Sequence, residues 1–219
     1  MAALDQERRD GFRAMARDRS PIVKMSRREG YALHVKAYKA LVKRAGLPGQ
    51  HSHGNMRSKP SQYSLQLREK QKVKRLYGLL ERQFSNQMKE ALSSRGQSGT
   101  DLLRHLEQRA DNVVYRAGFA TSRRASRQLV SHGHFMLNDR RIDIPSIRLR
   151  VGDVLQVREH STKTEYFKNL DEVSPAPNTV PEWLKVNRKK VTVEVTNLPT
   201  REDAEPDINE QLIVEYYSR

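Results

Sequence analysis

The chain has 219 residues and a formal net charge of +15, with 41 Lys and Arg side chains against 26 Asp and Glu. It has no cysteine, which excludes disulfides, thiolate zinc sites and a cysteine nucleophile. The longest stretch without a charged residue, 45–56, is far shorter than the roughly 20 apolar residues of a membrane span. Acidic residues among the first ten argue against a transit peptide, so we expect a soluble intracellular protein.

The positive charge is concentrated in the first half of the chain. Residues 1–99 carry 22 basic and 8 acidic side chains, whereas residues 161–219 carry 8 basic and 11 acidic ones. Such an excess repels itself unless a counter-charge is bound. We therefore expect the first half to bind a polyanion, with nucleic acid as the first choice, and the tail to face protein.

The first 60 residues predict an arm, a helix and a loop. Residues 1–25 lack a sustained apolar period and predict an extended basic arm. Residues 30–45 place apolar side chains every four positions, which predicts a helix. Residues 46–60 contain Gly and Pro at short intervals and predict a loop.

Residues 62–91 carry the strongest helical pattern. The apolar side chains that fall on one face are Val73, Tyr77, Leu80, Phe84 and Met88. Gly78 interrupts this face, so one helix or two in series both fit. The basic side chains on the other faces predict a polar back that points outward. The SSRGQSG segment at 93–99 is the expected domain boundary.

Residues 100–158 predict two helices on a small antiparallel sheet. Thr100 and Ser122 are suitable N-caps, and Gly118 and Gly133 are suitable ends for the two helices. Alternating apolar residues then predict strands around 135–144 and 154–157, with Asn138-Asp139 as a tight hairpin turn.

In the tail we expect a helix over 162–170, a strand over 190–196 and a short apolar segment over 208–217 that docks on the body. Trp183 is the only tryptophan in the sequence, and we interpret it as a packing anchor.

The sequence contains no recognisable catalytic constellation. It lacks a phosphate-binding glycine loop, a His-Glu-x-x-His pair and a Gly-x-Ser-x-Gly elbow. His51 and His53 lie close together without further ligand residues, so we expect RNA contact or hydrogen bonding there and no metal site. We expect no cofactor, small-molecule substrate or membrane partner.

Three basic features favour binding of a folded RNA. Arginine forks bind phosphate oxygens in pairs, and a helix N-terminus adds free N–H groups. The first feature is the helix start at Ser122, Arg123, Arg124 and Arg127, whose arginines are expected to point outward, with His132 at the helix end. The second is the hairpin tip with Asn138, Arg140 and Arg141. The third is the long helix with Arg68, Lys70, Lys72, Lys74 and Arg75. Recognition by phosphate, 2′-hydroxyl and shape is expected.

Several motifs resemble a known family. LLRHLEQRADNVVYRAGFATSRRASRQLVSHGHFMLNDRRIDI at 102–144, followed by VGDVLQVRE, resembles the small RNA-binding module named after bacterial ribosomal small-subunit protein four. Pseudouridine synthases and tyrosyl-tRNA synthetases also carry this module, so the module alone does not identify the family and the rest of the chain must. MARDRSPIVKMSRREG (15–30), PGQH (48–51), YSLQLREKQKVKRLYGLLERQF (63–84) and DINEQLIVEYYSR (207–219) resemble the ribosomal protein family itself.

The resemblance implies an α+β fold in which a mainly helical N-terminal domain is joined to a small module of two helices on a short antiparallel sheet. The expected divisions are an extension at 1–14, the helical domain at 15–98, the module at 99–160 and a C-terminal segment at 161–219 that packs back on the body. The resemblance departs at the N-terminus, where many members carry four zinc-binding cysteines and this chain has none.

The resemblance also implies a function. It is that of a primary binder of small-subunit ribosomal RNA at a 5′-domain helix junction, acting early in assembly and contributing to translational accuracy in the cytoplasmic small subunit. The implied partners are ribosomal small-subunit protein five and, where it enters the subunit, messenger RNA. The residues that fall on the family's RNA-facing motifs are Arg17, Lys24, Arg27, Arg28, Gln50, His51, Gln66, Arg68, Lys70, Lys72, Ser122, Arg123, Arg127 and Asn138.

Two other classes of function remain as alternatives. A free RNA chaperone or translational repressor would use the same surface. An RNA-modification enzyme would use the module as a tether, but it needs a catalytic domain that the remaining segments are too short to supply.

Overall fold

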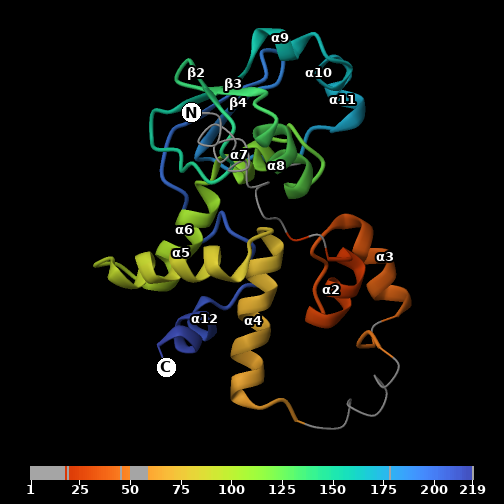
Figure 1. Ribbon diagram of the computed structural model, residues 1–219, viewed down its shortest axis with the longest axis vertical. Coiled ribbons are helices and arrows are strands. Elements are labelled where there is room, and N and C mark those ends of the chain that lie inside the picture. The colour runs from red at the N-terminus through yellow and green to blue at the C-terminus, as the bar shows by residue number, and fades with distance from the viewer. Residues whose placement is uncertain (1–17, 19, 45, 50–58, 178, 219) are drawn as a thin grey trace, which may run out of the picture.

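The structure, a computed structural model, describes residues 18, 20–44, 46–49, 59–177 and 179–218 (Figure 1). The helices within them are α2 (Ile22–Glu29), α3 (Val35–Lys43), α4 (Gln62–Leu76), α5 (Glu81–Ser93), α6 (Ser98–Glu107), α7 (Ala110–Arg116), α8 (Arg123–Ser131), α9 (Glu159–Thr162), α10 (Glu165–Lys168), α11 (Leu170–Val173) and α12 (Glu210–Tyr217). The strands are β1 (Phe135–Leu137), β2 (Arg140–Ile142), β3 (Val154–Val157), β4 (Leu184–Asn187) and β5 (Thr192–Val195). No helix in these ranges combines the length and apolar character that crossing a membrane requires.

Two hydrophobic cores divide the molecule into two lobes. The first lobe consists of α2 to α6 and α12, whose buried side chains include Val73, Phe84, Met88, Leu103 and Ile213. α12 lies beside α4 and makes extensive contact with it (Figure 1). The apolar segment expected at 208–217 therefore docks on the first half of the chain.

α2 lies partly inside the region expected to be an extended arm, and that expectation is wrong for residues 22–25. Pro21 precedes the helix with a φ of −62°, and Met25 and Ser26 are buried. A short sequence with two buried positions gives too little periodicity to detect, but it suffices once the helix packs against α3 and α4.

The pattern at 62–91 forms two helices, because the chain turns at Gly78 with a φ of +65°. Glycine adopts this left-handed backbone conformation without strain, and a residue in that conformation ends a helix such as α4. The turn also changes the face that points inward, so Leu79 is buried, and Leu80, which was expected in the core, is the N-cap of α5.

The helix expected over 100–117 is also two helices. Gln97, not Thr100, precedes α6, and the chain bends at Arg109, where Ala110 N donates to Ile147 O at 2.8 Å. The buried leucines of α6 belong to the first core, and Ala110 and Val113 of α7 belong to the second. The two cores therefore meet near residue 108, whereas we expected the division at 93–99.

The second lobe packs α7 and α8 against a five-stranded antiparallel sheet of order β2-β1-β3-β5-β4. Asn138 and Asp139 have φ values of 45° and 65°, and they join β1 to β2 as the predicted hairpin. The sheet is larger than expected, because β4 and β5 come from the tail, beyond the residues assigned to the module. Trp183 is buried in this core, which confirms its role as a packing anchor.

The helix expected over 162–170 consists of short turns, α9 to α11. Phe167 and Leu170 are buried against the second core, and Tyr166 Oη donates to Phe119 O at 3.0 Å. The chain then returns to the first lobe through residues 198–209, so it crosses between the lobes twice.

Candidate RNA interface

The start of α8 is built as the sequence predicts. Ser122 is the N-cap, and its Oγ accepts a hydrogen bond from Ala125 N at 3.2 Å. Arg123 and Arg124 follow in the first turn, where the backbone N–H groups have no partners within the helix. An anion at this position would meet both the free N–H groups and guanidinium groups.

The first turns of α8 open into a cleft between the lobes. The cleft has a volume of about 880 Å³, and its other walls come from α2, α3 and the end of α4. Six predicted RNA-binding residues line it together: Arg75, Ser122, Arg123, Arg124, Arg127 and His132. Asp18 and Asp143 also line the cleft. Because the four arginines outnumber these two carboxylates, the walls carry more positive than negative charge.

Arg123 does not point straight outward, contrary to expectation. Its side chain is only 12% exposed. Its Nε donates to Asn112 Oδ1 at 3.0 Å, and its Nη2 donates to Glu205 Oε1 at 3.0 Å. The guanidinium also lies over the ring of Tyr115, 4.6 Å from its centroid. These contacts fix the orientation of Arg123 at the wall of the cleft.

Arg127 is likewise 12% exposed, and its Nη1 lies 3.4 Å from Asp111 Oδ2. Asp111 also accepts two hydrogen bonds from Arg109. Arg124 is exposed and donates to Ser20 O at 3.1 Å, across the cleft on the side of α2. The prediction that all three arginines face solvent is therefore wrong for two of them, because α7 and the segment before α12 supply carboxylates.

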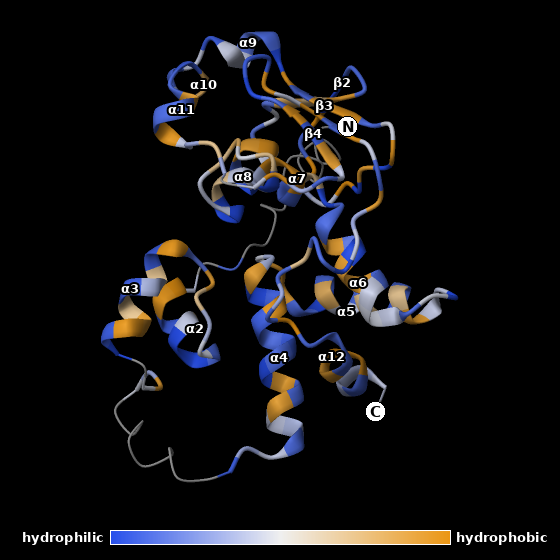
Figure 2. Ribbon diagram, turned by 180° about the vertical axis from the view of Figure 1, so that it is seen from behind, coloured by the Kyte–Doolittle hydropathy of each residue, from blue (hydrophilic) through white to orange (hydrophobic). Residues whose placement is uncertain are grey.

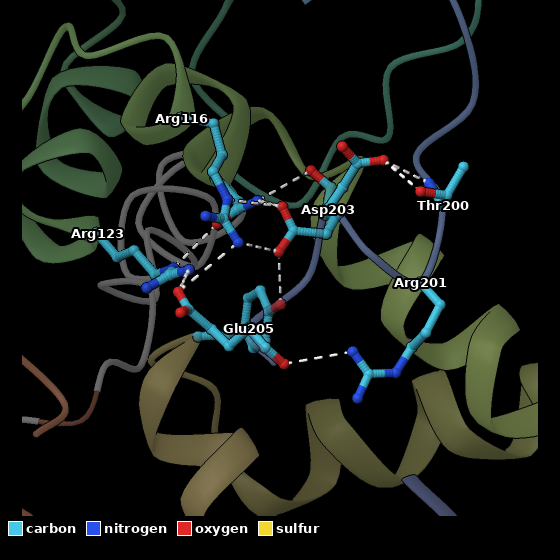
Figure 3. A network of polar contacts seen from close by, with 9 residues as sticks. Arg116, Arg123, Thr200, Arg201, Asp203 and Glu205 are labelled. Carbon is cyan, nitrogen blue, oxygen red and sulfur yellow. Dashed lines mark hydrogen bonds and ion pairs between the residues drawn. The ribbon is translucent and has the colours of Figure 1, made fainter. Parts of the chain in front are cut away.

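A polar network centred on the buried Glu107 is connected to the start of α8 through Asn112 and Arg123. Glu107 is fully buried and accepts from Tyr77 Oη at 2.6 Å, Asn112 Nδ2 at 2.6 Å and Arg116 Nη2 at 2.8 Å. In Figure 3, Arg116 and Arg123 approach Glu205 from the same side, with nitrogens 3.7 Å and 3.0 Å from Glu205 Oε1. Glu205 precedes α12, so this network joins the two lobes.

Burial and neighbouring charges shift the pKa values of Glu107 in this network and of His34 at the cleft. Burial opposes ionisation of Glu107, but Arg116, Arg123 and the hydroxyl of Tyr77 together outweigh burial and lower the pKa of that carboxyl below its usual value. Burial also lowers the pKa of His34 at the cleft, and the nearby Arg124 adds to this effect. At neutral pH, Glu107 is therefore charged and His34 is neutral.

The basic residues of α4 are mostly held inside the first lobe, which contradicts the outward polar back. Gln66 and Lys70 are buried. Gln66 Nε2 donates to Glu215 Oε2 at 2.8 Å, and Lys70 Nζ lies 2.6 Å from Glu81 Oε1 and 4.4 Å from the centre of the Tyr216 ring. The side chains of this group thus connect α4 to α5 and α12.

The remaining predicted residues of α4 are also paired. Lys72 Nζ lies 2.8 Å from Glu69 Oε1 and donates to Asp207 O at 2.6 Å. Arg68 and Arg75 both contact Glu29 of α2. Despite these arginines, burial raises the pKa of Glu29. α4 therefore positions α2 at one wall of the cleft.

The predicted residues near the N-terminus are divided. Lys24 and Arg28 are exposed on α2, and Arg27 donates to Gly46 O at 2.8 Å, which holds the segment after α3. Arg17, Gln50 and His51 lie outside the described residues, as does His53.

At the hairpin, Asn138 has a structural role that its turn position did not reveal. Its Nδ2 donates to Asp153 Oδ1 at 2.8 Å, and its Oδ1 accepts from Val154 N at 2.9 Å. Arg140 and Arg141 are exposed beside it. The hairpin thus presents arginines from a turn that is fixed by Asn138.

Sequence reasoning missed the partners of the cleft arginines, Asp111, Asn112 and Glu205. It also missed His34, whose Nδ1 accepts from Lys36 N at 2.9 Å as the N-cap of α3. A histidine immediately before an apolar helical pattern was a weak signal for this cap. Within the described ranges, His, Asp and Glu side chains form no group of three that could hold a metal ion.

Comparison with known proteins finds matches in both lobes. Residues 17–107 match the family described as "Ribosomal protein S4/S9 N-terminal domain", and residues 108–155 match the S4 domain. The small ribosomal subunit protein uS4 of Roseiflexus sp. (strain RS-1) is 50% identical over 206 residues, which cover 94% of this chain and all of the relative. The uS4 proteins of Clostridioides difficile (strain 630) and Chlorobium luteolum are 49% and 47% identical, with the same coverage. The chain therefore belongs to the uS4 family of small ribosomal subunit proteins.

Proposed function

We propose that the chain is a structural, non-enzymatic protein of the small ribosomal subunit, and that it binds small-subunit ribosomal RNA in the cytoplasm. The observation that carries the proposal is the cleft at the start of α8, where six residues predicted from the sequence lie together. The relatives, which are small ribosomal subunit proteins and match nearly the whole chain, support the same assignment.

The chemistry of the cleft suits a phosphate backbone. Guanidinium groups bind phosphate oxygens in pairs, and the first turn of α8 adds N–H groups. Because Arg123 and Arg127 are already oriented by carboxylates, they lose little side-chain freedom when RNA binds. A phosphate that enters the cleft would therefore meet guanidinium groups that are already oriented.

The finer parts of the proposal concern the place of binding and the partners. We infer binding at a helix junction in the 5′ domain, an early role in assembly and a contribution to translational accuracy. We also infer contact with ribosomal small-subunit protein five and with messenger RNA where it enters the subunit. The sequence motifs support these inferences. The two-lobed form supports the first of them, because a cleft between lobes suits a junction better than a single duplex.

The test is a titration of the full chain with a 5′-domain fragment of small-subunit RNA at constant Mg²⁺. If six to ten phosphates are neutralised, affinity falls by roughly 10³–10⁵-fold between 50 and 200 mM salt. A nearly flat salt response would contradict electrostatic binding. Co-sedimentation with small subunits through a high-salt wash distinguishes a ribosomal constituent from a free RNA chaperone.

A further inference from the structure

The outer side of α3 exposes a row of large apolar side chains, which we call the α3 stripe: Val35, Tyr38 and Val42. Their exposed fractions are 81%, 64% and 71%, the three highest among the large hydrophobic residues that the structure describes. The spacing of three and four residues puts them on one line along the helix, over about 10 Å.

The α3 stripe is not the side of the helix that packs into the first lobe. The opposite side of α3 already carries the buried Ala37, and the helix packs against α2 through that side. In Figures 1 and 2, α3 lies at the outer edge of the first lobe, and Figure 2 shows hydrophobic residues along it. The stripe is therefore an additional apolar surface, and such surfaces mark binding sites.

The charge around the stripe identifies the chemistry of its occupant. Lys36, Lys39 and Lys43 are exposed on α3, and none of them pairs with an acidic side chain among the described residues. The sequence from residue 30 to residue 68 contains no Asp or Glu at all. An apolar face bordered by three lysines is complementary to a polyanion that also has apolar faces, which describes nucleic acid.

The stripe is also continuous with the candidate RNA interface, because Val35 lines the cleft and Tyr38 and Val42 extend away from it along α3. An RNA strand leaving the cleft on this side would pass over the stripe.

We propose that Tyr38 stacks against an unpaired nucleotide of the bound RNA, with Val35 and Val42 against neighbouring riboses and the lysines of α3 near phosphates. This inference rests on the proposed function and specifies one of its contacts. A paired base offers no free face, so an exposed ring fits a bulge, loop or junction nucleotide. Stacking on aromatic side chains tolerates any base, because every base has a π-face.

The experiment compares Tyr38→Ala, Tyr38→Phe and the control Leu198→Ala by titration with the 5′-domain RNA fragment at two salt concentrations. Leu198 is exposed but lies in the acidic tail. Loss of stacking should weaken binding by roughly 5- to 150-fold for Tyr38→Ala and leave the salt slope unchanged. Tyr38→Phe keeps the ring and should bind within about twofold of the wild type, as should Leu198→Ala.

A spectroscopic arm tests the stacking itself. Tyr38→Trp should lose fluorescence when RNA is added, whereas Leu198→Trp should not. Trp183 is buried, so its emission provides a constant background.

The outcomes separate the two levels of the proposal. Wild-type binding that Tyr38→Ala leaves unchanged overturns the stacking contact alone. If Tyr38→Ala keeps RNA affinity but loses a small-subunit protein from reconstituted particles, the stripe binds protein and the inference is wrong. Failure of the wild type to bind the fragment overturns the proposed function as well.

Discussion

Two basic residues of α4 and two of α8 have acidic partners, but the two pairs differ in what lies on their other side. Lys70 and Lys72 of α4 are enclosed by α5, α12 and the segment before it, so their charges hold the first lobe together. Arg123 and Arg127 of α8 are held by carboxylates on one side and line the cleft on the other.

We infer that this difference separates the cations that bind RNA from the cations that hold the first lobe together. A net charge of +15 indicates a polyanionic partner, but it does not indicate which cations meet that partner. We propose that a cation of this chain is available to RNA where an open cleft adjoins it, whether or not it also has an internal partner. The variants below test this distinction.

The largest expected effect concerns the network under α8. Glu107→Gln keeps the shape of the side chain but takes from the half-buried Arg116 the fully buried carboxylate that it contacts at 2.8 Å, which leaves only Glu205 at 3.7 Å. Removing one partner of a buried ion pair costs about 3–5 kcal/mol. We therefore expect the free energy of unfolding, measured by urea denaturation, to fall by about that amount.

The exposed Glu202 provides the matched control for this variant. Glu202→Gln should change stability by no more than about 0.5 kcal/mol. A loss below about 1 kcal/mol for Glu107→Gln would show that the network is not the support that its burial indicates.

The network also shows what the sequence could and could not predict. The cap of α8 and the hairpin at 138–139 were predicted correctly, because their signals are local: a serine before an arginine-rich helix and two residues suited to positive φ. Glu205 contacts Arg123 from 82 residues away, and β4 and β5 join the sheet from the tail. The alternation at 190–196 did predict the strand that forms β5, but no local pattern encodes which distant segment such a strand or side chain contacts.

The second prediction compares the two helices directly. Arg127→Ala should weaken RNA binding by about 1–3 kcal/mol, the scale of a charge-assisted bond to phosphate, and lower the salt slope by about one. Because Arg127 also contacts Asp111, we expect a stability loss of about 1 kcal/mol, although Arg109 still pairs with that carboxylate. Arg127→Lys should restore part of the affinity, since an ammonium group cannot form the fork.

Lys70→Ala is the counterpart on α4. It removes a buried ammonium group from Glu81 and from the Tyr216 ring, so stability should fall by about 1–2 kcal/mol while RNA affinity stays unchanged. Binding titrations and melting curves of both variants decide the comparison. Equal losses of RNA affinity would mean that α4 and α8 do not differ in function.

The smallest expected effect concerns Glu81, the carboxylate that receives Lys70. Burial opposes its ionisation, but hydrogen bonds from Lys70, Lys74 and Tyr217 lower the pKa of Glu81 to about 2. A carboxyl whose pKa is depressed in the folded state adds stability that is complete above its unfolded value, near 4.5, and is lost as the pH falls towards 2. Because half of the side chain is exposed, solvent screening limits this contribution to about 1 kcal/mol or less. Urea unfolding at pH 7 and near pH 2.5 should therefore show a smaller loss of stability for Glu81→Gln than for the wild type. If both lose stability equally over that range, the lysines of α4 do not stabilise the first lobe through this carboxylate, and their enclosure between α5 and α12 reflects packing of their alkyl chains alone.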